Sequence, residues 1–271
     1  MRHTPAKTAA DQPRAIGMLN VQAKARDGRS AIGHLRSSGC MKALFPRSTD
    51  ALEVITINTA GGLTGGDKVS LNAVAGVGSE LTLTTQAAER AYRAASGFAT
   101  ADTTLKAEAG ARVNWLPQEL ILFEGAALRR SLRIDLAADA EALMVEPVVF
   151  GRAAMGETLQ DVSFRDRIEI YRDGAPIYMD ALCLEGDLTL QLARLAQGAG
   201  AMASLVFAAP NAAAHLDPVR ALLPVTGGAS LLHPDLLALR LVAEDSFELR
   251  RALLPILDRL SGDKLPISWR L

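Results

Sequence analysis

The sequence predicts a mainly β protein, with stacked antiparallel or mixed sheets in a β-helix-like body and a small C-terminal α+β lobe that contains two helices. Short segments that alternate apolar and polar residues follow one another closely up to about residue 185, as in a chain built mostly of strands. Clear helical periodicity appears only after that point. We therefore expect a flexible tail at residues 1–15, a β-rich body at 16–185 and an α+β lobe at 186–271 packed on the body.

The first predicted strands are joined by glycine-containing turns. Residues 17–26 and 30–35 flank Asp27-Gly28, a dipeptide typical of tight hairpins. Residues 52–57 and 68–73 flank a segment with four glycines, and we expect these two strands to pair as a wide antiparallel hairpin. In residues 80–85, leucines occupy one face and threonines the other, which suits a half-buried strand.

The second half of the body continues the same pattern. We expect hairpins around Gly110 and around Asp173-Gly174, a well-alternating strand at 128–136, and a strand at 142–150 that Pro147 breaks.

The C-terminal lobe is expected to follow the order β-α-β-β-α. The strands are predicted at residues 202–208, 229–232 and 236–242, and the first helix at 212–223. The second helix, residues 246–260, is the clearest amphipathic segment: Asp245 can cap its start, Gly262 ends it, and Pro255 should kink or break it.

Composition excludes several classes of function. The 271 residues carry a net charge of -1 and only 4% aromatic residues, so neither nucleic acid nor an anionic membrane is an expected partner. The longest nearly apolar run, residues 198–210, is too short to span a bilayer. Cys40 and Cys183 are far apart and no secretory signal precedes the body, so we expect a cytoplasmic protein.

Residues 58–67, Asn-Thr-Ala-Gly-Gly-Leu-Thr-Gly-Gly-Asp, form the most unusual segment. Its paired glycines, Gly61, Gly62, Gly65 and Gly66, indicate a backbone shape that side chains would obstruct. A phosphate-binding loop needs lysine where Asp67 stands and a helix after it, whereas an alternating strand follows here. A structural turn is therefore the better interpretation.

Three further segments are dense in hydrogen-bonding groups. Residues 85–93 follow a strand and form either a solvated crossing or a polar wall beside the glycine-rich segment. Residues 115–119 and 150–157 place such groups near strand ends, which indicates either paired internal charges or a polar cavity. The candidate side chains in these segments are Gln86, Glu89, Arg90, Gln118, Glu119, Arg152 and Glu157.

No catalytic or metal-binding signature is evident. The four histidines, His3, His34, His215 and His233, are scattered and share no ligand spacing, so we expect no tight metal site. A nucleophile elbow of the form G-x-S-x-G is absent as well.

The segments 58–67, 85–93, 115–119 with Phe123 and Glu124, and 150–157 together resemble the urease accessory protein UreD family, called UreH in some bacteria. The resemblance is weak beyond about residue 190, and the region around Cys40 follows the family only loosely. It implies a non-catalytic, mostly β scaffold that binds urease apoprotein and the accessory proteins UreF and UreG. In that family, nickel is delivered to urease while UreG hydrolyses GTP, and a water-filled passage through UreD is the proposed nickel route.

On this basis, Asp67, Thr64 and the seven candidate side chains named above are expected to line a polar passage that contacts Ni²⁺ only transiently, with no tightly bound cofactor. Asp67 has two possible roles: a local one, accepting backbone N–H bonds in the turn, and a transfer one, touching nickel briefly. We favour the transfer role. The alternative function is a small-molecule or nucleotide-binding enzyme with its site at residues 61–67.

Overall fold

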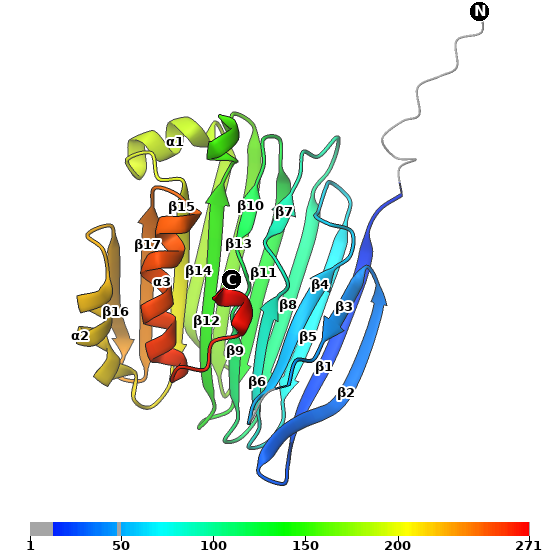
Figure 1. Cartoon of the computed structure of the whole chain (residues 1–271), viewed down its shortest axis with the longest axis vertical. Helices are drawn as coiled ribbons and strands as arrows, with labels where there is room; N and C mark the ends of the chain where they lie inside the picture. The colour runs from blue at the N-terminus through cyan, green and yellow to red at the C-terminus, as the bar shows by residue number, and fades with distance from the viewer. Residues whose placement is uncertain (1–12, 48–49, 271) are drawn as a thin grey trace, which may run out of the picture.

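The computed structural model describes residues 13–47 and 50–270, and its strands form two sheets stacked face to face (Figure 1). The predicted tail at residues 1–15 lies almost wholly outside the described residues. The seven-stranded sheet contains, in spatial order, β14 (Ala175–Gly186), β13 (Val162–Arg172), β11 (Ala127–Leu136), β8 (Ala99–Ala107), β5 (Lys68–Ala75), β1 (Ile16–Arg26) and β2 (Arg29–Gly39). The ten-stranded sheet contains β16 (Gly227–His233), β17 (Leu236–Ala243), β15 (Ala201–Ala208), β12 (Glu141–Phe150), β9 (Arg112–Trp115), β6 (Glu80–Thr85), β4 (Leu52–Asn58) and β3 (Met41–Leu44), with β10 (Leu120–Leu122) beside β12 and β7 (Glu89–Ala91) beside β10.

In the body, the chain winds from one sheet to the other. It passes from β4 to β5, then to β6, and later through β8, β9, β11, β12 and β13, alternating between the ten-stranded and the seven-stranded sheet. Successive turns of this winding therefore lie side by side and parallel, as in the pairs β5–β8, β8–β11, β4–β6 and β6–β9. This arrangement confirms the prediction of a mainly β fold with a β-helix-like body.

Two predicted hairpins are confirmed and two are wrong. Antiparallel pairs form across Asp27-Gly28, between β1 and β2, and across Asp173-Gly174, between β13 and β14. The glycine-rich segment and Gly110 instead join strands of different sheets, β4 to β5 and β8 to β9. Each of these strands has a parallel partner one winding away, and local turn chemistry does not distinguish a hairpin from a corner between sheets.

The prediction that Pro147 breaks its strand is also wrong, because β12 continues through it. The N–H of Phe150 donates to the Gly200 carbonyl at 2.8 Å, on the β15 side. Backbone N–H groups point alternately to the two sides of a strand, so the backbone nitrogen of Pro147 points away from β15. On that side the neighbouring strands leave a gap, since β9 ends at Trp115 and β10 begins only at Leu120. The missing N–H of Pro147 therefore removes no hydrogen bond between strands.

Beyond residue 186, β15 pairs antiparallel with β12, and β17 and β16 extend the ten-stranded sheet, each antiparallel to the strand beside it. The domain boundary stays a prediction. The expected helices are present as α2 (Ala212–Leu222) and α3 (Ser246–Ser261). Asp245 caps α3 by accepting the Glu248 N–H at 2.8 Å, Gly262 ends it, and the helix runs on through Pro255 without a break. A third helix, α1 (Leu188–Leu195), was not predicted, because its short sequence alternates like a strand.

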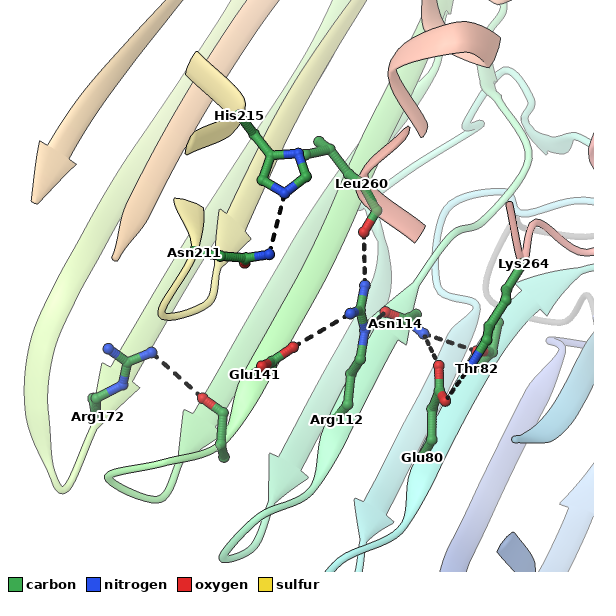
Figure 2. Close-up of polar contacts among 11 residues, drawn as sticks. Glu80, Thr82, Arg112, Asn114, Glu141, Arg172, Asn211, His215, Leu260 and Lys264 are labelled. Atoms are coloured by element: carbon green, nitrogen blue, oxygen red, sulfur yellow. Dashed lines mark hydrogen bonds and ion pairs between the residues drawn. The ribbon is translucent and has the colours of Figure 1, made fainter. Parts of the chain in front are cut away.

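Helix α3 covers the outer face of the ten-stranded sheet (Figure 1). Its buried side chains include Leu249, Leu253 and Ile256, whereas Phe247 in its first turn is exposed. Its C-terminal end is held by a polar network on the sheet (Figure 2). There Arg112 donates to the Leu260 carbonyl at 2.8 Å.

Figure 2 shows how that network continues across the sheet. Arg112 also donates to Asn114 at 3.0 Å and to Glu141 at 3.3 Å, and Lys264 reaches Glu80 at 3.3 Å. The network joins α3 and the chain after it to three strands of the ten-stranded sheet.

Candidate functional site

A cavity of about 250 Å³ lies between the two sheets. Its walls come from β5, β8 and β11 on one side and from β4, β6, β9, β10 and β12 on the other. Gly61, Gln86 and Arg90 line it and are exposed, so they form its mouth, whereas Gln118 and Glu146 line it and are buried. The cavity thus leads from the glycine-rich segment into the interior.

Three charged side chains meet at the inner end of the cavity. Arg130 on β11 bonds both oxygens of Asp166 on β13, at 2.9 and 2.6 Å, and approaches Glu146 on β12 at 2.5 Å. The indole N–H of Trp115 donates to the other oxygen of Glu146 at 2.6 Å. We call Arg130, Glu146 and Asp166 the buried triad; with all three ionised, it carries a net charge of -1.

The buried triad belongs to a polar layer that crosses the interior, defined by Arg130, Glu146, Asp166, Asp180, Ser204 and Arg240. Ser204 pairs across strands with Glu146 on one side and with Arg240 on the other. Arg240 donates to Ser204 at 3.2 Å and forms an ion pair with Asp180. The layer separates two apolar clusters between the sheets: on β11, for example, Leu128 belongs to one cluster and Leu132 to the other.

Burial determines how the triad ionises. Removal from water raises the pKa of Glu146 to about 7, and the nearby Asp166 charge adds to this effect, although Arg130 and the Trp115 hydrogen bond oppose it. Burial disfavours the charge of Arg130 too, but its two carboxylate partners outweigh that and raise its pKa. Asp166 takes both parallel bonds of Arg130, and Glu146 is the carboxylate whose pKa burial raises.

Glu89 is the charged group just inside the mouth. Its side chain accepts hydrogen bonds from Asn58 at 3.1 Å and from the Arg90 backbone N–H at 3.0 Å. Burial raises the pKa of Glu89, although those hydrogen bonds favour its charged form. The mouth therefore holds a carboxylate that its neighbours orient by hydrogen bonds and that forms no ion pair with another described side chain.

Four of the predicted passage residues line the cavity: Gln86, Glu89, Arg90 and Gln118. The side-chain nitrogen of Gln118 is buried and has no hydrogen-bond partner among the described residues, so it leaves a free donor on the cavity wall. Three come from residues 85–93, expected to form either a solvated crossing or a polar wall, and Gln118 comes from residues 115–119, expected to form either paired internal charges or a polar cavity. The structure brings these two segments together.

Asp67 lies outside the cavity lining and is buried in the glycine-rich segment. Its two oxygens accept the backbone N–H groups of Ala15 and Thr64, each at 2.8 Å. Thr64 in turn donates its hydroxyl to the Arg93 carbonyl at 2.8 Å. This geometry is that of the local role for Asp67.

The other candidates also lie elsewhere. Glu119 pairs with Arg250 of α3 at 2.8 Å, which ties the helix to the segment before β10. Arg152 and Glu157 form a two-pronged ion pair, with both bonds at 3.0 Å, in the loop after β12. Neither group lines the inter-sheet cavity.

Two of the four glycines, Gly62 and Gly65, serve close packing. A Cβ on Gly62 would lie 2.3 Å from the Tyr92 ring, and one on Gly65 would lie 2.1 Å from the Ser96 carbonyl oxygen. Strand β5 begins directly after Asp67, so no helix N-terminus is available to bind a phosphate. Nothing in this geometry favours the nucleotide-binding alternative.

The buried triad was not among the predicted site residues, yet the sequence carries a signal for it. Arg130 falls on the same face of its strand as Leu128 and Leu132, and Asp166 falls on the same face as Phe164 and Ile168. A charge at an inward-facing position of a strand indicates a polar site in the interior.

Metal ligands do not cluster in the part of the chain that the structure describes. It contains no group of three or more His, Cys, Asp or Glu side chains able to hold an ion, and Cys40 and Cys183 are unpaired thiols. In residues 13–47 and 50–270, no helix has the length and apolar character needed to cross a membrane. Weak, transient nickel binding stays a prediction.

Fold and site together define a two-sheet, solenoid-like protein whose charged groups converge on an interior cavity. Its sequence matches the family model described as UreD urease accessory protein over residues 15–268. The urease accessory protein UreD of Roseobacter denitrificans is 54% identical over 267 residues, which cover 97% of this chain and 98% of that protein. Those of Ruegeria sp. (strain TM1040) and Rhizobium etli are 51% identical over 275 residues and 44% over 268, covering 97% of this chain in both cases and 93% and 98% of the relatives.

The chain therefore belongs to the UreD family of urease accessory proteins. It is an accessory protein of urease maturation rather than an enzyme. The family match confirms the resemblance and extends it well beyond residue 190, to residue 268.

Proposed function

We propose that this chain delivers nickel to urease as part of a complex with urease apoprotein, UreF and UreG, in the cytoplasm, with GTP hydrolysed on UreG. Nickel moves through the inter-sheet cavity. The observation that carries this proposal is the composition of the cavity wall, which offers carboxylate, amide and hydroxyl oxygens but neither histidine nor cysteine.

Such a wall suits transport better than storage. Imidazole and thiolate ligands bind nickel strongly, whereas oxygen ligands bind it more weakly and exchange it more readily. Glu89 at the mouth and Glu146 at the inner end place one carboxylate at each end of the cavity. A cation can therefore meet successive weak ligands without being trapped.

The charges at the inner end of the cavity also favour passage of a cation. Arg130 alone would repel a divalent cation, but Asp166 and Glu146 outnumber it when both are ionised. The inner end of the cavity is then net negative, and protonation of Glu146 makes it neutral.

The test is urease activation reconstituted from apoprotein, UreF, UreG, GTP, nickel and this chain. We expect a Glu89→Gln/Glu146→Gln double variant to lower the nickel content of urease while it still co-purifies with UreF and urease. Glu108→Gln, at an exposed ion pair with Lys106, is the matched control and should deliver nickel normally. Full nickel content with the double variant would refute transport through the cavity, and failure of the wild-type chain to co-purify with its partners would refute the scaffold.

A further inference from the structure

Both sheets end at the same side of the molecule, where the strands β1, β2 and β3 lie (Figure 1). There β2 is the outermost strand of the seven-stranded sheet and β3 the outermost strand of the ten-stranded sheet. We call residues 16–47, which include β1, β2 and β3, the N-terminal edge. It lies apart from the cavity lining except at Met41.

Strand β2 is unusually open for a strand of eleven residues. From Ile32 to Gly39 every residue is exposed, so neither face of this part of the strand is covered. On the side of β2 that faces away from β1, the backbone makes one hydrogen bond to another described residue. The Ser30 N–H donates to the Asp50 carbonyl at 2.8 Å. The strand thus presents backbone donors and acceptors that another strand can pair with.

Apolar side chains are exposed along the same edge. Ile32 and Leu35 on β2 are 41% and 43% exposed, Leu44 on β3 is 54% exposed, and Ile16 at the start of β1 is 66% exposed. An edge protected only against aggregation is expected to carry charges in such positions rather than large apolar groups. These side chains therefore indicate a surface that a partner covers.

The charge of this edge differs sharply from that of the whole chain. Residues 16–47 contain one acidic residue and six basic ones, a net charge of +5, whereas the whole chain carries -1. All six basic residues are exposed: Lys24, Arg26, Arg29, Arg36, Lys42 and Arg47. Charge complementarity therefore selects an acidic partner.

We propose that β2 is a docking edge for an extended, acidic segment of a partner protein. The segment adds to the seven-stranded sheet as a further strand and pairs with the free backbone side of β2. Its apolar side chains cover Ile32 and Leu35, and its carboxylates face Arg29 and Arg36. This proposal concerns a surface outside the cavity and does not depend on nickel transport.

The probe is a fluorescein-labelled octapeptide of alternating glutamate and valine, titrated into the full chain and followed by fluorescence anisotropy. We expect saturable binding that weakens as salt rises, because exposed charges are screened. An Arg29→Glu/Arg36→Glu double variant should bind at least about tenfold more weakly. Arg194→Glu, an exposed charge reversal on α1, is the matched control and should bind as the wild type does.

Two further measurements distinguish strand pairing from charge attraction alone. The same peptide with alternate backbone nitrogens methylated keeps its charge but loses half of its donors, and it should bind at least about tenfold more weakly. Hydrogen exchange of the amides of residues 29–39 should slow when the unmodified peptide binds. Absence of peptide binding, or equal binding by the methylated peptide or by the double variant, would overturn the proposal.

Other classes of ligand give different results in the same experiment. Tighter binding of a short RNA or of phosphatidylserine vesicles than of the peptide, abolished by the double variant, would make the edge an anion-binding surface for those ligands and overturn the proposal. Concentration-dependent dimerisation, abolished by the same variant, would assign the edge to a second copy of this chain and overturn it as well.

Discussion

Replacing Glu146 by glutamine should change how the stability of the protein depends on pH. The carboxyl group of Glu146 is buried beside Arg130 and Asp166, and burial raises its pKa to about 7 from an ordinary value of 4.5. Glutamine keeps the size of the side chain and can still accept the Trp115 hydrogen bond, but it cannot titrate. The variant therefore isolates the proton on Glu146 from the packing around it.

The raised pKa of Glu146 makes the protein less stable as pH rises. Between pH 4.5 and 7 the folded protein holds a proton on Glu146 that the unfolded chain has already released, so the stability contributed by this group is lost as pH rises through that window. At about 1.4 kcal/mol for each pH unit, the loss over the whole window amounts to about 3–4 kcal/mol and is complete somewhat above pH 7.

Urea unfolding of the wild type and of Glu146→Gln at several pH values from 5 to 8.5 measures this effect. The unfolding free energy of the wild type, minus that of the variant, should fall by roughly 2–3 kcal/mol across the range, because part of the loss already lies below pH 5. A difference that stays level or rises with pH would refute the raised pKa of Glu146 and the change of the buried triad from neutral to a net charge of -1 across this range.

Glu157→Gln is the control of opposite sign. The Arg152 hydrogen bonds hold the pKa of Glu157 below its usual value, so its contribution to stability should be present at neutral pH and lost as pH falls through that lowered pKa. In the range from pH 5 to 8.5, the difference between wild type and Glu157→Gln should therefore stay nearly level.

Three other predictions concern helix α3, the glycine-rich segment and nickel. Leu253→Ala should lower the unfolding free energy by about 2–5 kcal/mol, since Leu253 is buried against the sheet; an unchanged melting temperature with lost partner binding would instead identify α3 as an interface. Asp67→Asn should cost about 1–3 kcal/mol in urea unfolding and Asp67→Ala more, because the two oxygens accept separate backbone N–H groups; full stability of the Ala variant would contradict this local role. Calorimetry on the isolated chain should show weak, exchangeable nickel binding, and one nanomolar site with a His or Cys ligand set would contradict it.

The strands themselves were predictable because each carries its own alternation. In β11, Leu132, Ile134 and Leu136 face the interior, as the period of two requires, and the tight Asx-Gly hairpins at residues 27 and 173 are local features. Which strands pair was not predictable in the same way. Strand β5 lies between β1 and β8, not beside β4, and the four glycines between β4 and β5 would suit a hairpin as well as a corner between sheets.

The cavity was predictable in part. Segments rich in hydrogen-bonding groups indicated Gln86, Glu89 and Gln118, which line it. Glu119 belongs to one of the same segments but pairs with Arg250, which lies 131 positions further along the chain. A local pattern shows that a side chain is polar, whereas its partner depends on how the whole chain winds.

Stability does not account for the buried triad. The Arg112 network on the outer face consists of partly exposed groups that fasten α3 to the sheet, and such groups give up little hydration. Arg130, Glu146 and Asp166 are at most 13% exposed as side chains, and removing two carboxylates and a guanidinium from water costs several kcal/mol for each ion. Each member of the triad lies on its strand between one residue of each apolar cluster: Leu128 and Leu132, Met144 and Val148, and Phe164 and Ile168. Well-packed apolar residues in place of the triad would join the two clusters and give a folded state at least as stable. The folded protein therefore keeps charged groups at the inner end of the cavity. The pH dependence of stability measures how much free energy the ionisation of Glu146 costs there.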